Sequence, residues 1–121
     1  MDREIKSQIL AEGILGWILL GSWELGVWYE GKTKMMRRDE WDPFENWAHY
    51  GILKDKLCSL GFTTRVERFP DTGRIEVAIL STDQSINEIY HTGFNDELTE
   101  FAKAALIFYY ANKEKIHEQR I

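Results

Sequence analysis

The first part of the chain changes from a helical to an extended pattern of apolar residues. Over residues 2–15 the apolar positions fall on one side of a helix, which Gly16 ends. Residues 17–20 are apolar without a helical period and predict a strand or a buried segment. In residues 21–38 three glycines break any helix, whereas Val27–Tyr29 favours extended structure. This part is therefore predicted to form short strands or an irregular loop.

The segment Trp41–Glu45 carries the clearest helix-start signal. Asp42 is a good N-cap, Pro43 suits the first helical position, and Glu45 suits the acid of a capping box. We predict a helix that begins at Pro43 and stops at Gly61. Its apolar stripe contains Trp47, Tyr50, Leu53, Leu57 and Leu60, and the single cysteine, Cys58, is expected on the apolar side.

Beyond residue 61 the pattern alternates, as it does in a half-buried strand. Residues 62–67 and 75–79 alternate in this way around the turn residues 70–73, so an antiparallel hairpin is predicted. A third strand is expected over residues 86–92, after a polar turn at 81–84.

The last helix is predicted over residues 96–116. Its core stripe contains Leu98, Phe101, Ala102, Ala105, Phe108 and Tyr109, and the apolar arc widens to Leu106, Ile107 and Tyr110. A helix that is apolar on two sides buries a second face, either in its own chain or against a partner. This second face favours a homo-oligomer.

Together these elements predict an α+β fold, an antiparallel β-sheet with helices packed on it. At 121 residues the chain, 1–121, has the size of a single domain.

The formal net charge of −5 argues against binding to extended nucleic acid. One cysteine permits no intrachain disulfide, and three dispersed histidines show no metal-ligand spacing, so neither a metal nor another cofactor is expected. The start lacks a signal-peptide pattern and no apolar stretch is long enough to cross a bilayer, so a soluble, cytoplasmic protein without membrane contact is expected.

Three groups of residues are candidate ligand-binding sites, each with a structural alternative. Trp41, Phe44 and Trp47 gather at a predicted helix start, where they would stack on a base, or would simply belong to the core. Arginines flank the hairpin and would clamp phosphates, or would pair with acids such as Glu76. Basic residues beside Trp28 and Tyr29 have the composition of a nucleotide site, or of a charged loop. The arginines of the second group are Arg65, Arg68 and Arg74, and the basic residues of the third are Lys32, Lys34, Arg37 and Arg38.

Catalytic chemistry finds little support in the sequence. Tyr90 and His91 would form an acid–base pair with Asp83, Glu88 or Asp96, but no nucleophile elbow, Walker loop or metalloprotease motif occurs. We therefore expect no enzyme and assign no catalytic residue.

The order of elements resembles that of the small bacteriophage and prophage proteins grouped as the phage ABA sandwich domain. The resemblance rests on Gly16-Trp17 after the first helix, on Trp41-Asp42-Pro43, and on Ala102–Leu106 in the last helix. It implies a three-layer α-β-α sandwich and a phage accessory protein in the cytoplasm of an infected or lysogenic bacterium. Residues 21–38 depart from the short members of the family and are expected to be an inserted loop or hairpin.

Two functions from different classes follow. The first is non-catalytic sequestration of a nucleotide-type immune signal, a counter-defence role that the resemblance suggests. The second is a protein–protein interaction module that blocks or adapts a host or phage protein through residues 21–38. A structural or assembly accessory of the phage is a further alternative.

Overall fold

The structure is a computed structural model that describes residues 2–22, 24–81 and 86–119. Its elements follow in the order α1 (Arg3–Leu10), the π-helical turn η1 (Ala11–Leu15), β1 (Ile18–Leu20), β2 (Val27–Glu30), β3 (Thr33–Arg37), the 3-10 turn η2 (Arg38–Glu40), α2 (Trp47–Ser59), β4 (Thr63–Phe69), β5 (Arg74–Leu80), β6 (Ile89–Gly93) and α3 (Glu97–Gln119).

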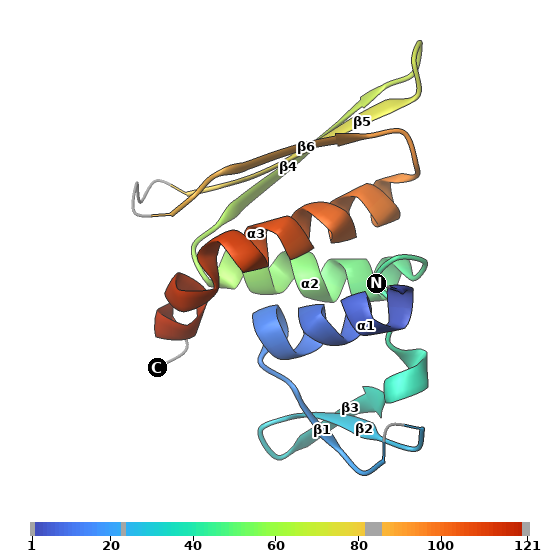
Figure 1. The fold of residues 1–121 in the computed structure, drawn as a ribbon, viewed down its shortest axis with the longest axis vertical. Helices are drawn as coiled ribbons and strands as arrows, with labels where there is room; N and C mark the ends of the chain where they lie inside the picture. The colour runs from blue at the N-terminus through green and yellow to red at the C-terminus, as the bar shows by residue number, and fades with distance from the viewer. Residues whose placement is uncertain (1, 23, 82–85, 120–121) are drawn as a thin grey trace.

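The strands form two antiparallel sheets, in the orders β1-β2-β3 and β4-β5-β6. Figure 1 shows the helices between them, with α3 against the β4–β6 sheet and α1 facing the β1–β3 sheet. The α+β class and the antiparallel pairing are thus confirmed. The order of layers differs from the expected α-β-α sandwich, because a helical layer here separates two sheets.

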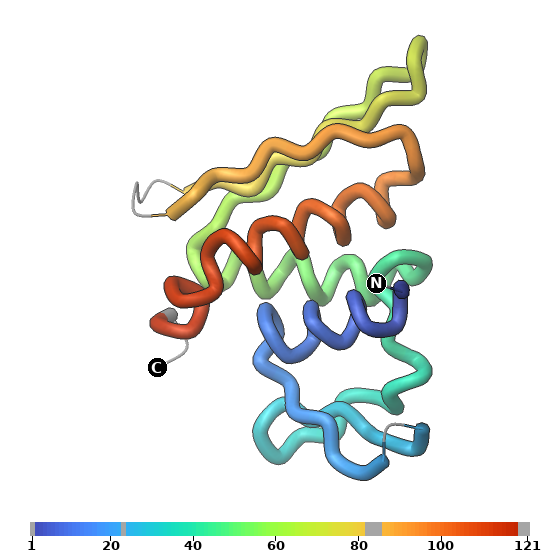
Figure 2. Tube along the Cα trace, viewed as in Figure 1, coloured from blue at the N-terminus to red at the C-terminus, as the bar shows by residue number. Residues whose placement is uncertain are grey.

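The different order of layers arises from residues 17–38. The pattern of residues 21–38 is compatible with short strands or a loop, and in the structure they form a three-stranded sheet together with the strand of residues 18–20. The tube in Figure 2 shows the chain leaving the helical layer after α1, forming this sheet and returning at α2. Trp28 is fully buried, and Leu19 and Met36 pack against the core beside it. The inner face of this sheet is therefore packed on the helical layer.

The first helix agrees with the prediction. The Asp2 side chain accepts a hydrogen bond from Ile5 N, and Gly16, with φ of 73°, ends the helical stretch. Its last turn is π-helical and lies close to α3, where a Cβ at Gly13 would meet the Tyr109 ring.

The predicted start of the second helix is wrong. α2 begins at Trp47, where the Asn46 side chain accepts from Ala48 N and His49 N. Asp42 caps a tight turn instead, by accepting from Phe44 N. Pro43 and Phe44 are buried, so packing of this turn places the helix start four residues later. The predicted stop at Gly61 is confirmed by its φ of 92°.

Two side chains of α2 lie on the opposite side from that expected. Trp47 is 57% exposed and Cys58 is also exposed, whereas Tyr50, Leu53 and Leu57 form the buried stripe. With Asn46 as the N-cap, Trp47 is the first residue of α2 and lies outside the core.

The hairpin is confirmed, with β4 and β5 paired from Thr63↔Leu80 to Phe69↔Arg74. The third strand, β6, begins at Ile89, three residues later than predicted. Of the polar turn at 81–84, residues 82–84 lie outside the described part of the chain. The projecting end of the β4–β5 hairpin is the most distant part of the sheet from the helices (Figure 1).

The last helix packs on both sides within the chain. One face meets β5 and β6, and the other meets α1, η1 and α2. Intrachain packing therefore accounts for the second apolar face, although Ile107 and Tyr110 remain 45% and 51% exposed. The helix kinks at Asn112, whose side-chain amide donates to Phe108 O and Asn87 O.

Aromatic side chains make up a large part of the core. Those of Trp17, Tyr50, Phe62, Phe101 and Phe108 are buried, and that of Tyr109 is half-buried.

Candidate functional site

The aromatic candidates do not gather at one surface. Trp28 is fully buried and Trp41 is 4% exposed, and both contact Trp17 inside the core. Trp41 also donates from its indole nitrogen to Ser7 O at 2.7 Å, and it stacks on His49. These rings offer no free face for a base. Trp47, on the surface of α2, contacts the Tyr50 ring.

The hairpin arginines lie on the other sheet and are engaged by acids. Arg68 binds one Glu97 carboxylate oxygen through two nitrogens, at 2.7 and 3.0 Å. Arg74 lies 3.6 Å from Glu76 and over the Phe69 ring, and the Arg65–Glu67 contact is 4.0 Å. The guanidinium of Arg68 is therefore bound by a carboxylate, whereas Arg65 and Arg74 lie near acids at distances too long for a hydrogen bond.

The Arg68–Glu97 pair belongs to a network that ties the hairpin to both long helices. The Tyr50 hydroxyl donates to the second Glu97 oxygen at 2.9 Å. Burial and this hydrogen bond raise the pKa of Tyr50 well above its usual range. Tyr50 therefore serves as a neutral donor that fixes α2 to α3.

The basic run divides into paired and unpaired residues. Arg37 lies 3.0 Å from Glu40 and 3.4 Å from Asp39, and Arg38 is largely buried with Glu4 3.7 Å away. Within the described chain, Lys32 and Lys34 form no ion pair. Lys32 occupies the β2–β3 turn and Lys34 lies on β3, the edge strand.

The unpaired lysines border an exposed apolar surface. Ile18 lies opposite Tyr29, which lies opposite Lys34; in the next row Leu20, Val27 and Arg37 are aligned in the same way. Residues directly opposite each other in a sheet share a face. We call this set the outer face; it consists of Ile18, Leu20, Val27, Tyr29, Lys34 and Arg37.

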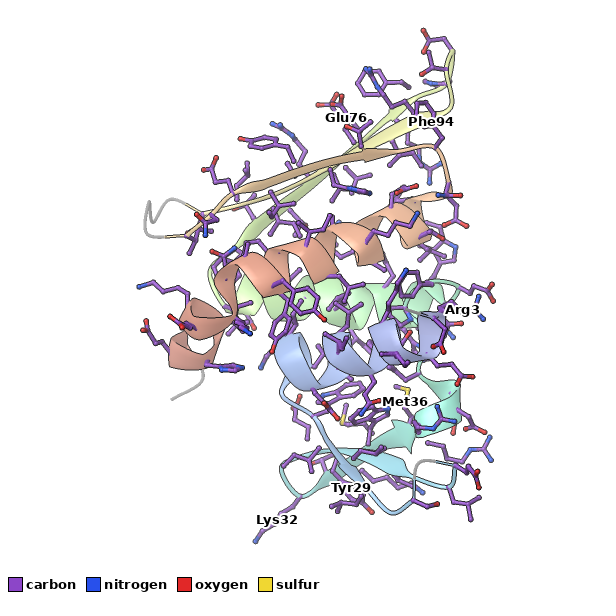
Figure 3. The ribbon with its side chains drawn as sticks, in the orientation of Figure 1. Arg3, Tyr29, Lys32, Met36, Glu76 and Phe94 are labelled. Carbon is purple, nitrogen blue, oxygen red and sulfur yellow. The ribbon has the colours of Figure 1, made fainter. Side chains whose placement is uncertain are left out.

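The outer face is turned away from the helices. Figure 3 shows Tyr29 on the side of the sheet opposite α1 and Met36 between the sheet and α1. Ile18 and Leu20 are 57% and 54% exposed, whereas Leu19 between them packs against the core. Two aliphatic side chains and a tyrosine ring thus adjoin one another with no element of the described chain above them.

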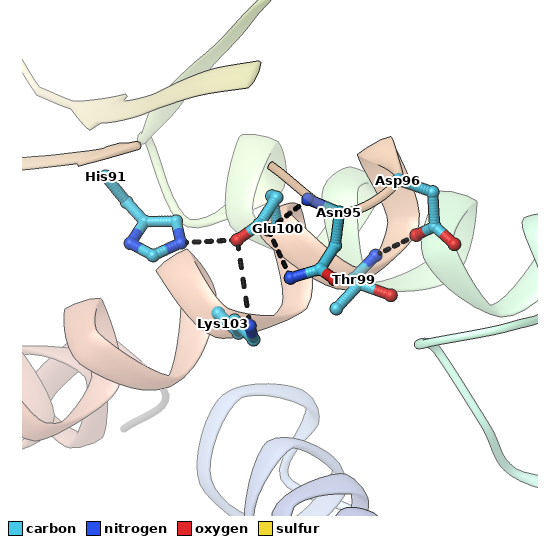
Figure 4. A network of polar contacts seen from close by, with 6 residues as sticks. All are labelled: His91, Asn95, Asp96, Thr99, Glu100 and Lys103. Atoms are coloured by element: carbon cyan, nitrogen blue, oxygen red, sulfur yellow. Dashed lines mark hydrogen bonds and ion pairs between the residues drawn. The ribbon is translucent and has the colours of Figure 1, made fainter. Parts of the chain in front are cut away.

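A buried carboxylate provides the most enclosed polar cluster (Figure 4). Glu100 is 1% exposed and accepts from the Asn95 backbone and side-chain nitrogens at 2.9 and 2.8 Å, while His91 Nε2 lies 2.8 Å away. Burial opposes its ionisation, but hydrogen bonds from His91 and Asn95 prevail, and the pKa of Glu100 is lowered. A Cβ at Gly93 would overlap this carboxylate. The cluster fastens β6 to the start of α3.

Sequence reasoning assigned other partners to His91, namely Asp83, Glu88 or Asp96. Asp83 lies outside the described residues, Glu88 accepts from the Tyr90 hydroxyl, and Asp96 caps Thr99 N. The acid that His91 does contact stands one turn inside α3. The glycine at position 93, beside a helix start, was the signal for such a close approach.

A third polar contact closes the loop before α2. The Asp42 backbone N–H donates to His49 Nδ1 at 2.9 Å, and burial lowers the pKa of His49. His49 Nδ1 can accept this hydrogen bond only when the ring is neutral. The side chain therefore stabilises the turn that precedes α2. In the residues that the structure covers, no three metal-ligating side chains gather closely enough to hold an ion.

No family model, curated protein or solved structure matches this chain. The resemblance to the phage sandwich family therefore stays a prediction. Among the helices that the structure describes, none is both long and apolar enough to span a membrane.

Proposed function

We propose that this chain is a non-enzymatic protein-binding module whose contact surface is the outer face of the β1–β3 sheet. The proposal rests on one observation: Ile18 and Leu20, more than half exposed, adjoin Tyr29 on a sheet face that no other element of the described chain covers. Adjacent apolar side chains of this kind mark interaction surfaces, whereas single exposed ones are ordinary.

The hydrogen-bonded clusters of polar side chains inside the fold support a non-enzymatic role. Glu97, Glu100 and His49 each make their contacts to neighbouring structural elements. Their hydrogen bonds hold the hairpin and α2 to α3, β6 to α3, and the loop before α2 to that helix, so these side chains have structural roles that require no substrate.

Within the basic run and the aromatic residues next to it, one ring of the described chain adjoins lysines that form no ion pair. That ring is Tyr29, with Lys34 opposite it and Lys32 in the adjoining turn. It lies on the same outer face, so a single set of variants separates nucleotide binding from protein binding.

The test compares proteins captured from the native cells by three forms of the chain. These are the wild type, the double variant Ile18→Ser/Leu20→Ser, and the control Ile107→Ser, which removes an exposed apolar side chain from α3. We expect a partner that the wild type and the control retain and the double variant loses. If no captured protein depends on the outer face, the proposal is wrong. A nucleotide that raises the melting temperature of wild type but not of Tyr29→Ala would establish the alternative function instead.

A further inference from the structure

The outer face has an apolar part on β1 and β2 and a positively charged part on β3. Its β1 and β2 positions are apolar, whereas both β3 positions, Lys34 and Arg37, are cationic. Each row across the sheet therefore runs from an aliphatic residue on β1, through an apolar residue on β2, to a cation at the β3 edge. Lys32 extends the cationic edge into the turn, where Figure 3 shows it directed away from the molecule.

Among the described residues, no acid pairs with the positive charges of Lys32 and Lys34 at the β3 edge. Asp39 and Glu40 compensate Arg37, and the two lysines form no ion pair with any residue that the structure describes. Glu30, the acid closest to them along the chain, accepts from the Trp17 indole nitrogen toward the inner face. A chain with a net charge of −5 thus presents a locally positive edge beside its exposed apolar surface.

From this arrangement we propose that the outer face binds an acidic amphipathic segment of another protein. Apolar side chains of the segment would cover Ile18, Leu20 and Tyr29, while its carboxylates would lie beside Lys32 and Lys34. This inference rests on the proposed function and adds the chemistry of the partner. Charge complementarity of this kind selects partners and orients them on the surface.

A second copy of the chain is a poorer occupant of this face. Two outer faces brought together around a two-fold axis would each offer apolar positions and cations, since the acids near β3 are already bound to Arg37. The outer face itself contains no carboxylate, so the lysines of both copies would meet no acid within it. An acidic segment supplies the groups that a second outer face lacks.

The experiment is a selection from displayed random peptides about 16 residues long, enough for a strand or a helix of four turns. Peptides are selected on the wild-type chain and depleted on Ile18→Ser/Leu20→Ser. We expect the retained peptides to combine acidic with apolar residues. Their binding to Lys32→Glu/Lys34→Glu should weaken on the order of tenfold or more, since attraction at two surface pairs becomes repulsion.

The matched control for charge is Lys54→Glu/Lys113→Glu, which reverses two exposed lysines of α2 and α3 and should leave the affinity within about twofold. Circular dichroism and thermal unfolding establish that each variant is folded. Peptides that are retained but neutral or basic, or whose binding ignores the Lys32/Lys34 reversal, overturn the inferred partner chemistry and leave the surface intact. If no peptide distinguishes the wild type from Ile18→Ser/Leu20→Ser, the proposed function itself is overturned.

Discussion

Replacing Glu100 with glutamine tests how the buried carboxylate holds β6 against α3. The carboxylate accepts two hydrogen bonds from Asn95 and contacts His91 Nε2. A glutamine keeps one oxygen for His91 but turns its amide hydrogens toward the two Asn95 donors. A hydrogen bond to a charged group contributes about 1.5–3 kcal/mol, and we take the lower value because Asn95 is exposed and can turn to water.

Loss of the two Asn95 bonds therefore lowers the free energy of unfolding by about 3 kcal/mol, and the melting temperature by about 10 °C. Urea and thermal unfolding at pH 7 measure both quantities. The control is Glu114→Gln, which removes an exposed carboxylate from the same helix and should change stability by less than about 0.5 kcal/mol. A loss below about 1 kcal/mol for Glu100→Gln, or equal losses for the two variants, would refute the reasoning.

The pH dependence follows from the direction of the Glu100 shift. Because the folded-state pKa lies below its ordinary value of 4.5, ionisation of Glu100 favours the folded chain. That contribution is complete above the unfolded pKa and disappears as the pH falls through the folded pKa. The stability gap between wild type and Glu100→Gln should thus narrow as the pH falls below about 4.5. A gap that stays constant down to about pH 3 would contradict this assignment.

Three further predictions concern α2 and its contacts. Gly51→Ala should stabilise the chain by about 0.5–1 kcal/mol in urea unfolding, because a Cβ there meets no atom within 4 Å and alanine favours the helix; a destabilised variant would show that α2 is misplaced. Asn46→Ala should cost about 1 kcal/mol in the same assay as the N-cap is lost, and an unchanged midpoint would argue for a helix start elsewhere. Spectrophotometric titration of the folded chain to about pH 11 should give the same phenolate signal for wild type and Tyr50→Phe, since the pKa of Tyr50 is raised; a signal smaller by one tyrosine in the variant would show that Tyr50 ionises normally.

The sequence predicted the bounds of an element correctly where those bounds depend only on residues nearby in the chain. The β4–β5 hairpin follows from strict alternation and from the Pro70–Gly73 turn, and Gly61 ends α2 as expected. The start of α2 was misplaced because Asp42 and Asn46 are both good caps, four residues apart. Burial of Pro43 and Phe44, which depends on the rest of the fold, decides between them.

The sequence indicated some of the residues that lie at the candidate site but not how they are arranged in space. Sequence reasoning grouped Tyr29 with Lys32 and Lys34 because they are close along the chain, and the strand pairing places Lys34 opposite Tyr29. It also grouped Trp28 and Trp41 with them, and both lie in the core. Alternation tells which residues share a face of a strand, but not which face a second layer will cover. Ile18 and Leu20 were missed for the same reason, since an apolar run is the usual mark of a buried strand.

The same limit applies to Glu100. In the sequence, an acid in the first turns of a helix indicates only a favourable interaction with the helix dipole, which depends on local sequence. The contact with His91 requires β6 to return alongside α3, an arrangement set by the packing of the whole sheet on the helix.

The most direct test of the outer face as a binding surface is site-specific photo-crosslinking in the native cells. A photoreactive phenylalanine replaces either Leu20, on the outer face, or Tyr90, which is 68% exposed on the other sheet. The account predicts a discrete adduct with another protein from position 20 and none from position 90. An adduct from position 90 alone, equal adducts from both positions, or none from either would contradict it.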